Sequence, residues 1–218
     1  MILVMSSALL SAGCAAVPDG GAHATSTPSQ SDPAETPSSS APADAPESLG
    51  FAEGAQLDPM AMVGWNVSMG GDDAAWTHNP DAETGEVSFV NADGTCTAYY
   101  YQEVFETAAA DDRSASDELL AEVAGLSADE VATYAADEYF VLTHASTPGV
   151  ADGEVANRSV IVEADGKMWL MAARVFTNLD SAASQMSNAY SLQLACDADV
   201  DPLTQLSSLD EIAKVLVD

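Results

Sequence analysis

The sequence predicts a single α/β sandwich of the α+β type, in which helices pack on an antiparallel sheet of about six to seven strands and a helix ends the chain. Three observations support this class. Strand-like apolar runs are separated by tight-turn residues, two helix-capping patterns lie mid-chain, and another cap precedes an apolar stripe at the C-terminus. The predicted domain covers residues 49–218, about 170 residues, which is enough for one sizeable core.

The strand predictions rest on apolar runs bounded by turn residues. Asp93-Gly94 and Asp165-Gly166 each lie between two such runs, and glycine tolerates the positive φ of a tight hairpin turn. Runs 155–164 and 167–177 carry apolar residues at consecutive positions, which is typical of central strands covered on both faces. The predicted strands are 63–67, 86–90, 95–104, 139–146, 155–164, 167–177 and 190–196.

Two helices are predicted between the hairpin and the later strands. Ser116 is suited to cap the first helix and Gly125 to end it. Ser127 and Glu130 have the spacing of a capping box, which predicts a second helix through about Ala136.

The C-terminal residues carry a further cap signal. Asp201 is suited to cap a segment that begins with Pro202. Ser208 and Glu211 then predict a terminal helix over Leu209–Val217, with an apolar stripe on one side.

The N-terminus carries an apolar run followed by Ser11-Ala12-Gly13-Cys14. The run holds only about 10 residues, whereas a membrane-spanning helix needs roughly 20. The segment resembles a bacterial lipoprotein signal peptide, although Ser11 stands where that family usually has Leu and no Lys or Arg precedes it. The resemblance implies a signal peptide over 1–13, lipidation of Cys14, and a place on the outer face of the bacterial cytoplasmic membrane. The alternative is an ordinary secretory signal.

Residues 14–48 are predicted to be a disordered tether behind the lipid. They are rich in Ala, Ser, Thr, Pro and Asp and contain almost no large apolar side chain. Such a segment buries too little surface to offset its conformational entropy. It would hold a folded domain off the membrane at a distance on the order of 30 Å.

The charge is strongly negative, with 35 Asp plus Glu, 5 Lys plus Arg and a formal net charge of −30. This argues against nucleic acid as a partner and against electrostatic adhesion to anionic lipid. Membrane attachment would therefore depend on the lipid. The acidity is explained most simply by a solvated surface; binding of cations or of a basic partner is the alternative.

Cys96 and Cys196 are predicted to form a disulfide. With Cys14 assigned to the lipid they are the remaining pair, and each lies in a strand-like run on the apolar face. An exported domain folds in an oxidising compartment, where such a pair is normally oxidised. No zinc-type cysteine spacing is present.

The order of elements resembles the PsbP-like fold, which includes LpqN-type lipoproteins of high-GC Gram-positive bacteria. The resemblance covers roughly residues 50–218 and depends on that order, on Gly64-Trp65 and on the lipoprotein signal. It implies a binding or accessory role and supplies no catalytic residues. A cystatin-like fold, or another with a helix on a curved sheet, is the alternative.

No catalytic, cofactor or metal motif is recognised, so catalysis is not predicted. Asp197, Asp199 and Asp201 match the first three ligand places of a calcium loop, but Pro202 stands where glycine is needed and Ser208 where glutamate is needed. We therefore predict no metal site and keep the three aspartates as a calcium candidate only.

Four aromatic residues are candidates for contact with a ligand: Trp65, Trp169, Tyr99 and Tyr101. Tyr99 and Tyr101 share one face of a strand and Tyr100 the other. Ordinary packing of helices on a sheet is the alternative explanation for all four.

These observations predict a lipid-anchored, extracytoplasmic binding or accessory module without catalysis, whose partner is a protein or a cell-envelope component. Two alternatives stay open. The first alternative is a carrier or sensor for an apolar or cell-envelope ligand held between sheet and helix. The second is a hydrolase of envelope polymers, which needs either a pair of carboxylates or a Ser and a His that meet in one cleft.

Overall fold

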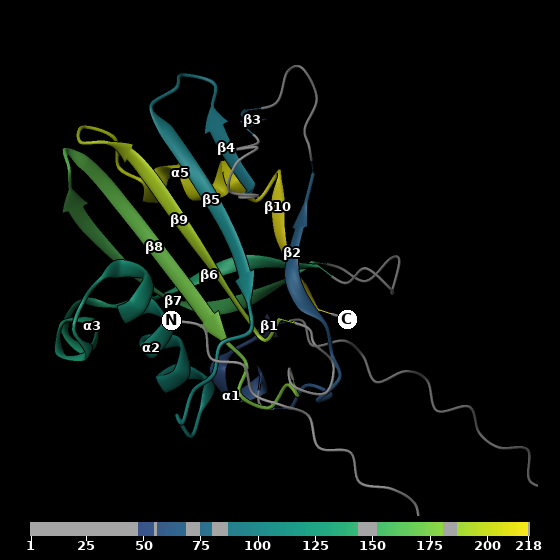
Figure 1. Ribbon diagram of the computed structural model, residues 1–218. Coiled ribbons are helices and arrows are strands. Elements are labelled where there is room, and N and C mark those ends of the chain that lie inside the picture. Colours follow the sequence, from purple (N-terminus) through teal and green to yellow (C-terminus); the bar gives the residue numbers. More distant parts are fainter. Residues whose placement is uncertain are drawn as a thin grey trace, which may run out of the picture. The chain divides into compact units, whose positions relative to one another are not determined.

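The computed structural model describes residues 48–54, 56–68, 75–79, 87–143, 152–180 and 187–217. All of them belong to the second of two compact units, Pro42–Asp218. The described residues form a mixed α+β fold with one large sheet, four helices and a C-terminal strand (Figure 1).

The elements follow one another along the chain with the labels of Figure 1. They are β1 (Ser48–Leu49), α1 (Phe51–Gly54), β2 (Val63–Val67), β3 (Trp76–His78), β4 (Val87–Asn91), β5 (Cys96–Glu103), α2 (Asp112–Ala124), α3 (Ala128–Tyr134), β6 (Ala136–Thr143), β7 (Gly153–Ala164), β8 (Lys167–Val175), β9 (Ala189–Asp197), α5 (Leu203–Leu209) and β10 (Ala213–Val217).

The sheet has ten strands in the order β2-β10-β6-β7-β8-β9-β5-β4-β3, with β1 paired to the start of β7. Neighbouring strands are antiparallel except for β10–β6 and β1–β7, which are parallel. The prediction of six to seven strands is therefore wrong. The seven predicted runs all contain strands, but β1 and β3 are too short to show a period, and β10 lies in the predicted helix.

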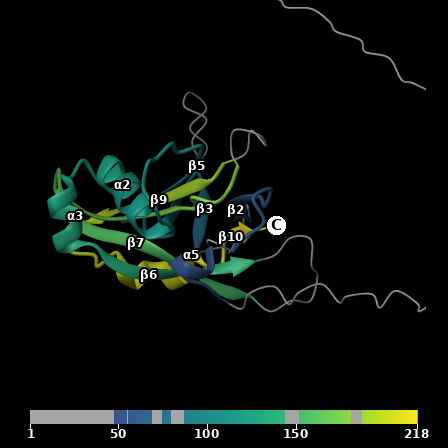
Figure 2. The ribbon, with the colours of Figure 1, turned by 90° about the horizontal axis from the view of Figure 1, so that it is seen from below.

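Two hydrophobic cores lie on opposite faces of the central strands, as the consecutive apolar residues of β7 and β8 predicted. On one face, Leu170 belongs to a buried cluster with Leu209 of α5 and Val215 of β10. On the other, Met171 belongs to a cluster with Leu120 of α2. Figure 2 shows α2 on one side of the sheet and α5 on the other.

The predicted C-terminal helix over Leu209–Val217 is wrong, because β10 occupies Ala213–Val217. Burial alternates along β10, which is the period of a strand, and β10 pairs with β2 over five residues. Ser208, the predicted N-cap of that helix, makes other hydrogen bonds instead. The Ser208 hydroxyl donates to the Gln205 carbonyl oxygen and accepts from Trp76 Nε1.

The first mid-chain helix begins earlier than predicted. Asp111, not Ser116, caps α2 by accepting from the Ser114 amide. Ser116 is buried inside the helix, where its hydroxyl donates to the Asp112 carbonyl oxygen and accepts from the Val175 amide. Gly125 ends α2 in the left-handed region, as predicted.

The predicted capping box of Ser127 and Glu130 is confirmed at the start of α3. The helix ends at Tyr134, and Ala136 already belongs to β6. The predicted disulfide is present as well. Cys96 of β5 and Cys196 of β9 face each other across the two paired strands.

Candidate functional site

The candidate site is an apolar groove of about 520 Å³ beside the end of β7, which we call the edge groove. Its volume is in the range of ligand-binding sites. It is lined by Leu126, Glu130, Tyr134, Ala136, Glu138, Ser159, Val160, Ile161, Val162, Glu163, Leu170 and Leu203. Leu126, which lies between α2 and α3, and segments of α3, β6, β7, β8 and α5 thus meet there.

Local sequence signals place one wall of the edge groove. Gly125 has a φ of 64°, and the chain reverses there so that the Leu126 amide donates to the Ala121 carbonyl oxygen. The capping box then starts α3 directly. Since α3 is only seven residues long, it brings Tyr134 to the point where β6 begins.

Large apolar side chains are exposed in the edge groove. Tyr134 is 68% exposed, Leu203 40% and Ile161 38%. They come from a helix on each face of the sheet and from the strand between them. Apolar side chains gathered in a hollow are typical of a binding surface, whereas single exposed ones are ordinary.

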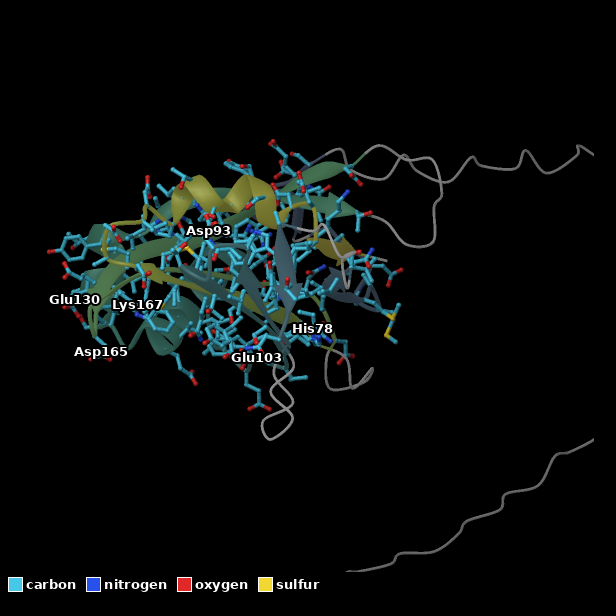
Figure 3. All side chains as sticks on the ribbon, turned by 90° about the horizontal axis from the view of Figure 1, so that it is seen from above. His78, Asp93, Glu103, Glu130, Asp165 and Lys167 are labelled. Carbon is cyan, nitrogen blue, oxygen red and sulfur yellow. A yellow bond between two sulfur atoms is a disulfide. The ribbon has the colours of Figure 1, made fainter. Side chains whose placement is uncertain are left out.

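Three glutamates belong to the lining of the edge groove: Glu130, Glu138 and Glu163. Hydrogen bonds from the hydroxyl and the amide of Ser127 hold the pKa of Glu130 below its ordinary value, so this carboxylate is ionised at neutral pH. Figure 3 shows Glu130 on the same side of the fold as Asp165 in the β7–β8 turn.

The cations of the chain are all engaged elsewhere. The five Lys and Arg residues of the sequence lie in the described part, and each pairs with an aspartate. The pairs are Arg113–Asp137, Arg158–Asp117, Arg158–Asp137, Lys167–Asp197, Arg174–Asp112 and Lys214–Asp152. None of these cations lines the edge groove, so its carboxylates give it a negative rim.

A second hollow of about 520 Å³ lies between β2 and β5 and includes Met62, Trp65 and Glu103 in its lining. Burial, and then the nearby charge of Glu122, raise the pKa of Glu103 above its ordinary value. Figure 3 shows Glu103 far from Glu130. This hollow is less apolar than the edge groove, which makes it the weaker candidate.

The four aromatic residues predicted to face a ligand do not line the edge groove. Trp65 is half-buried and lines the second hollow instead; its ring centre lies 4.9 Å from those of Tyr100 and Tyr190, and it donates Nε1 to the Tyr101 carbonyl oxygen. Trp169 is half-buried against the α2 cluster. Tyr99 and Tyr101 are partly exposed on β5, while Tyr100 is buried on the opposite face.

The calcium candidate is not assembled as a cluster. Asp197 pairs with Lys167 at 2.7 Å, and Asp201 accepts from the Leu203 amide. Among the described residues, no group of three or more His, Cys, Asp or Glu side chains is placed to hold a metal ion. Cys14 lies outside the described residues.

The edge groove was missed in the sequence, although its parts were visible there. Val160, Ile161 and Val162 are typical of one buried strand, and nothing local indicates that β6 begins only opposite Ser159 and so leaves them unpaired on that edge. Within the described residues, no helix is long and apolar enough to cross a membrane. No protein-family model, curated protein or solved structure matches this chain.

Proposed function

We propose that this chain is a lipid-anchored, extracytoplasmic binding module without catalysis, and that its ligand binds in the edge groove. The edge groove is the observation that carries the proposal, because it combines exposed apolar side chains and a negative rim with walls from α3, β6, β7, β8 and α5. The signal ahead of Cys14 and the Cys96–Cys196 disulfide support a place outside the cytosol.

The hydrogen bonds to Glu130 do not suit this side chain for the acid of a glycoside hydrolase. A glycoside hydrolase needs a carboxylic acid whose raised pKa keeps it protonated near neutral pH. The pKa of Glu130 is shifted in the opposite direction by Ser127. A carboxylate held in its charged form is suited to attract a cation.

A carrier for a small apolar ligand is the second candidate, favoured by the volume of the edge groove. The core between the sheet and α5 offers less room for such a ligand. The cavity beside Tyr100, Phe140 and Leu209 has about 10 Å³, which suits one water molecule at most. A small ligand held in the edge groove would contact the same residues, so one set of variants tests both candidates.

The lipid anchor is tested by metabolic labelling with an alkyne-bearing fatty acid. We expect the wild-type chain to take up the label and sediment with membranes, and Cys14→Ser to lose both properties. Ser11→Ala is the matched control and should keep the label. Label that persists in Cys14→Ser, or two reduced thiols at 96 and 196 in the native protein, would contradict the proposal.

Binding in the edge groove is tested by placing a photo-crosslinking amino acid at Tyr134 in the tethered protein. Tyr139 is the control, because it is 55% exposed but does not line the groove. We expect a discrete adduct from position 134 that Leu203→Ser weakens, and none from position 139. Equal adducts from both positions, or none from either, would count against the groove.

A further inference from the structure

The edge groove lies where a strand is missing from the sheet. β6 and β7 are paired from Leu142–Gly153 to Ala136–Ser159, and β6 begins there. β7 continues for five more residues, 160–164, paired with β8 on its other edge. In the part of the chain that the structure describes, no strand covers this edge of residues 160–164.

The hairpin turn fixes which backbone groups face the open edge. Asp165 and Gly166 have φ values of 53° and 72°, as in a two-residue turn in which the flanking residues, here Ala164 and Lys167, exchange both hydrogen bonds. Hydrogen-bonded and open positions alternate along an antiparallel pair. Ile161 and Glu163 therefore present two N–H donors and two carbonyl acceptors to the groove.

The walls of the groove fit a strand with apolar side chains on both faces. Side chains of an added strand would alternate between the face of α3, with Leu126 and Tyr134, and the face of α5, with Leu203. Ile161 and Val162 point to opposite faces beside it. At about 3.4 Å per residue, the open edge of β7 accommodates some five residues.

The charge of the groove selects among possible occupants. Glu130, Glu138 and Glu163 line it, and every Lys and Arg of the chain is already paired with an aspartate. A second copy would bring the same glutamates to the contact. Residues 15–47 contain no Lys or Arg, so this chain's own N-terminal segment offers no cation either.

We infer that the edge groove binds an extended, basic segment of another protein, which adds to the sheet as a strand along residues 160–164 of β7. This inference rests on the proposed binding function and names its ligand class. Backbone hydrogen bonds to Ile161 and Glu163 supply the register, the apolar walls take alternate side chains, and the glutamate rim pairs with flanking Lys or Arg.

The probe is a capped heptapeptide with three central Val or Ile residues and two Lys at each end, titrated into the full chain in nonionic detergent and followed by fluorescence anisotropy. We expect saturable binding that weakens as salt rises. Methylating the three central amide nitrogens should weaken binding by roughly 30-fold, the loss of two backbone hydrogen bonds. Replacing every Lys of the peptide with Glu should abolish binding.

Two variants of one residue separate backbone from charge. Glu163→Pro removes an N–H that faces the open edge and leaves the ladder to β8 intact, which a sheet edge tolerates. Glu163→Gln keeps that N–H and removes only the charge. We expect the proline variant to lose most of the peptide binding and the glutamine variant to lose less, with both thermal midpoints near that of the wild type. If Glu163→Pro fails to fold, the methylated peptide alone decides the question.

The outcomes distinguish this inference from the proposed function. If the methylated peptide binds as well as the unmethylated one, strand addition is overturned while the groove remains a binding site. If the Glu-substituted peptide binds as well as the Lys peptide, the basic character of the segment is overturned in the same way. If the chain forms a dimer that Glu163→Pro dissociates, the inference is overturned and the occupant is a second copy of the chain. No binding of any peptide overturns it too, and the carboxylates then only protect the edge from pairing. The crosslink at Tyr134 separately decides whether the proposed function stands.

Discussion

Replacement of Asp112 with alanine is expected to be the most damaging single change to a charged residue in this fold. Asp112 and Arg174 form an ion pair at 2.9 Å in which both side chains are 0% exposed. The Asp112 carboxylate also accepts from the amide and from the hydroxyl of Thr177, at 2.9 and 2.8 Å. Asp112→Ala thus leaves three donors without this acceptor: two from the half-buried Thr177 and the charged, fully buried guanidinium of Arg174.

The magnitude follows from that burial. Removing one partner of a buried ion pair costs about 3–5 kcal/mol, a large share of the 5–15 kcal/mol that is typical of a folded domain. Burial lowers the pKa of Arg174 from its ordinary value, and the neighbouring charges act against this. Its guanidinium lies between the rings of Phe51 and Phe176, at 4.3 and 4.6 Å from their centres. These rings leave water little access to the uncompensated charge.

The assay is urea unfolding followed by tryptophan fluorescence. Asp197→Ala is the control. The Asp197 side chain is 46% exposed and that of its partner Lys167 is 42% exposed, so this ion pair should contribute about 0–1 kcal/mol. Asp112→Asn keeps an acceptor for Thr177 but removes both the charge and the oxygen that accepts from Arg174, so its loss should be intermediate. A loss for Asp112→Ala no larger than that for Asp197→Ala would refute the reasoning.

Three further predictions concern the disulfide, a helix end and a titrating side chain. Replacing both Cys96 and Cys196 with serine should cost about 4–5 kcal/mol, because the bridge joins residues 100 apart, and urea unfolding measures it. Gly125→Ala should cost about 1–2 kcal/mol in the same assay: a Cβ there has open space, so the left-handed backbone alone accounts for the loss. Burial and Glu122 raise the pKa of Glu103, so its ionisation favours unfolding once the pH exceeds the ordinary carboxyl value. Glu103→Gln should therefore raise the thermal midpoint at pH 7 and lose that advantage below about pH 4; an equal gain at both pH values would be inconsistent with this cause.

The signals that succeeded were local ones. The Asp165-Gly166 turn, the Ser127 and Glu130 capping box and the Gly125 stop each depend on a few neighbouring residues, and each is in place. The disulfide followed from the number of cysteines and the alternation around them. The lipid anchor at Cys14 and the PsbP-like resemblance stay predictions.

Apart from the Ser116 cap, whose place Asp111 takes a few residues earlier, the signals that failed involve partners far away in the sequence. β1 and β3 have two and three residues, so they exist only because β7 and β4 supply the hydrogen bonds. The last residues of the chain carry a plausible helix cap, yet β10 forms there because β2 and β6 flank it. Pairing along a sheet and burial of alternate side chains outweighed a local preference.

The sequence by itself determined the α+β class, the hairpins, the end of α2, the cap of α3, the acidity and the oxidised cysteine pair, because each depends on composition or on short-range geometry. Only the tertiary structure decided where β6 begins relative to β7. That offset is set by the pairing of Ala136 with Ser159 and by the position of α3, and it leaves the backbone of Ile161 and Glu163 open beside an apolar groove. A free strand edge is a relation between two strands, and no single stretch of residues records it.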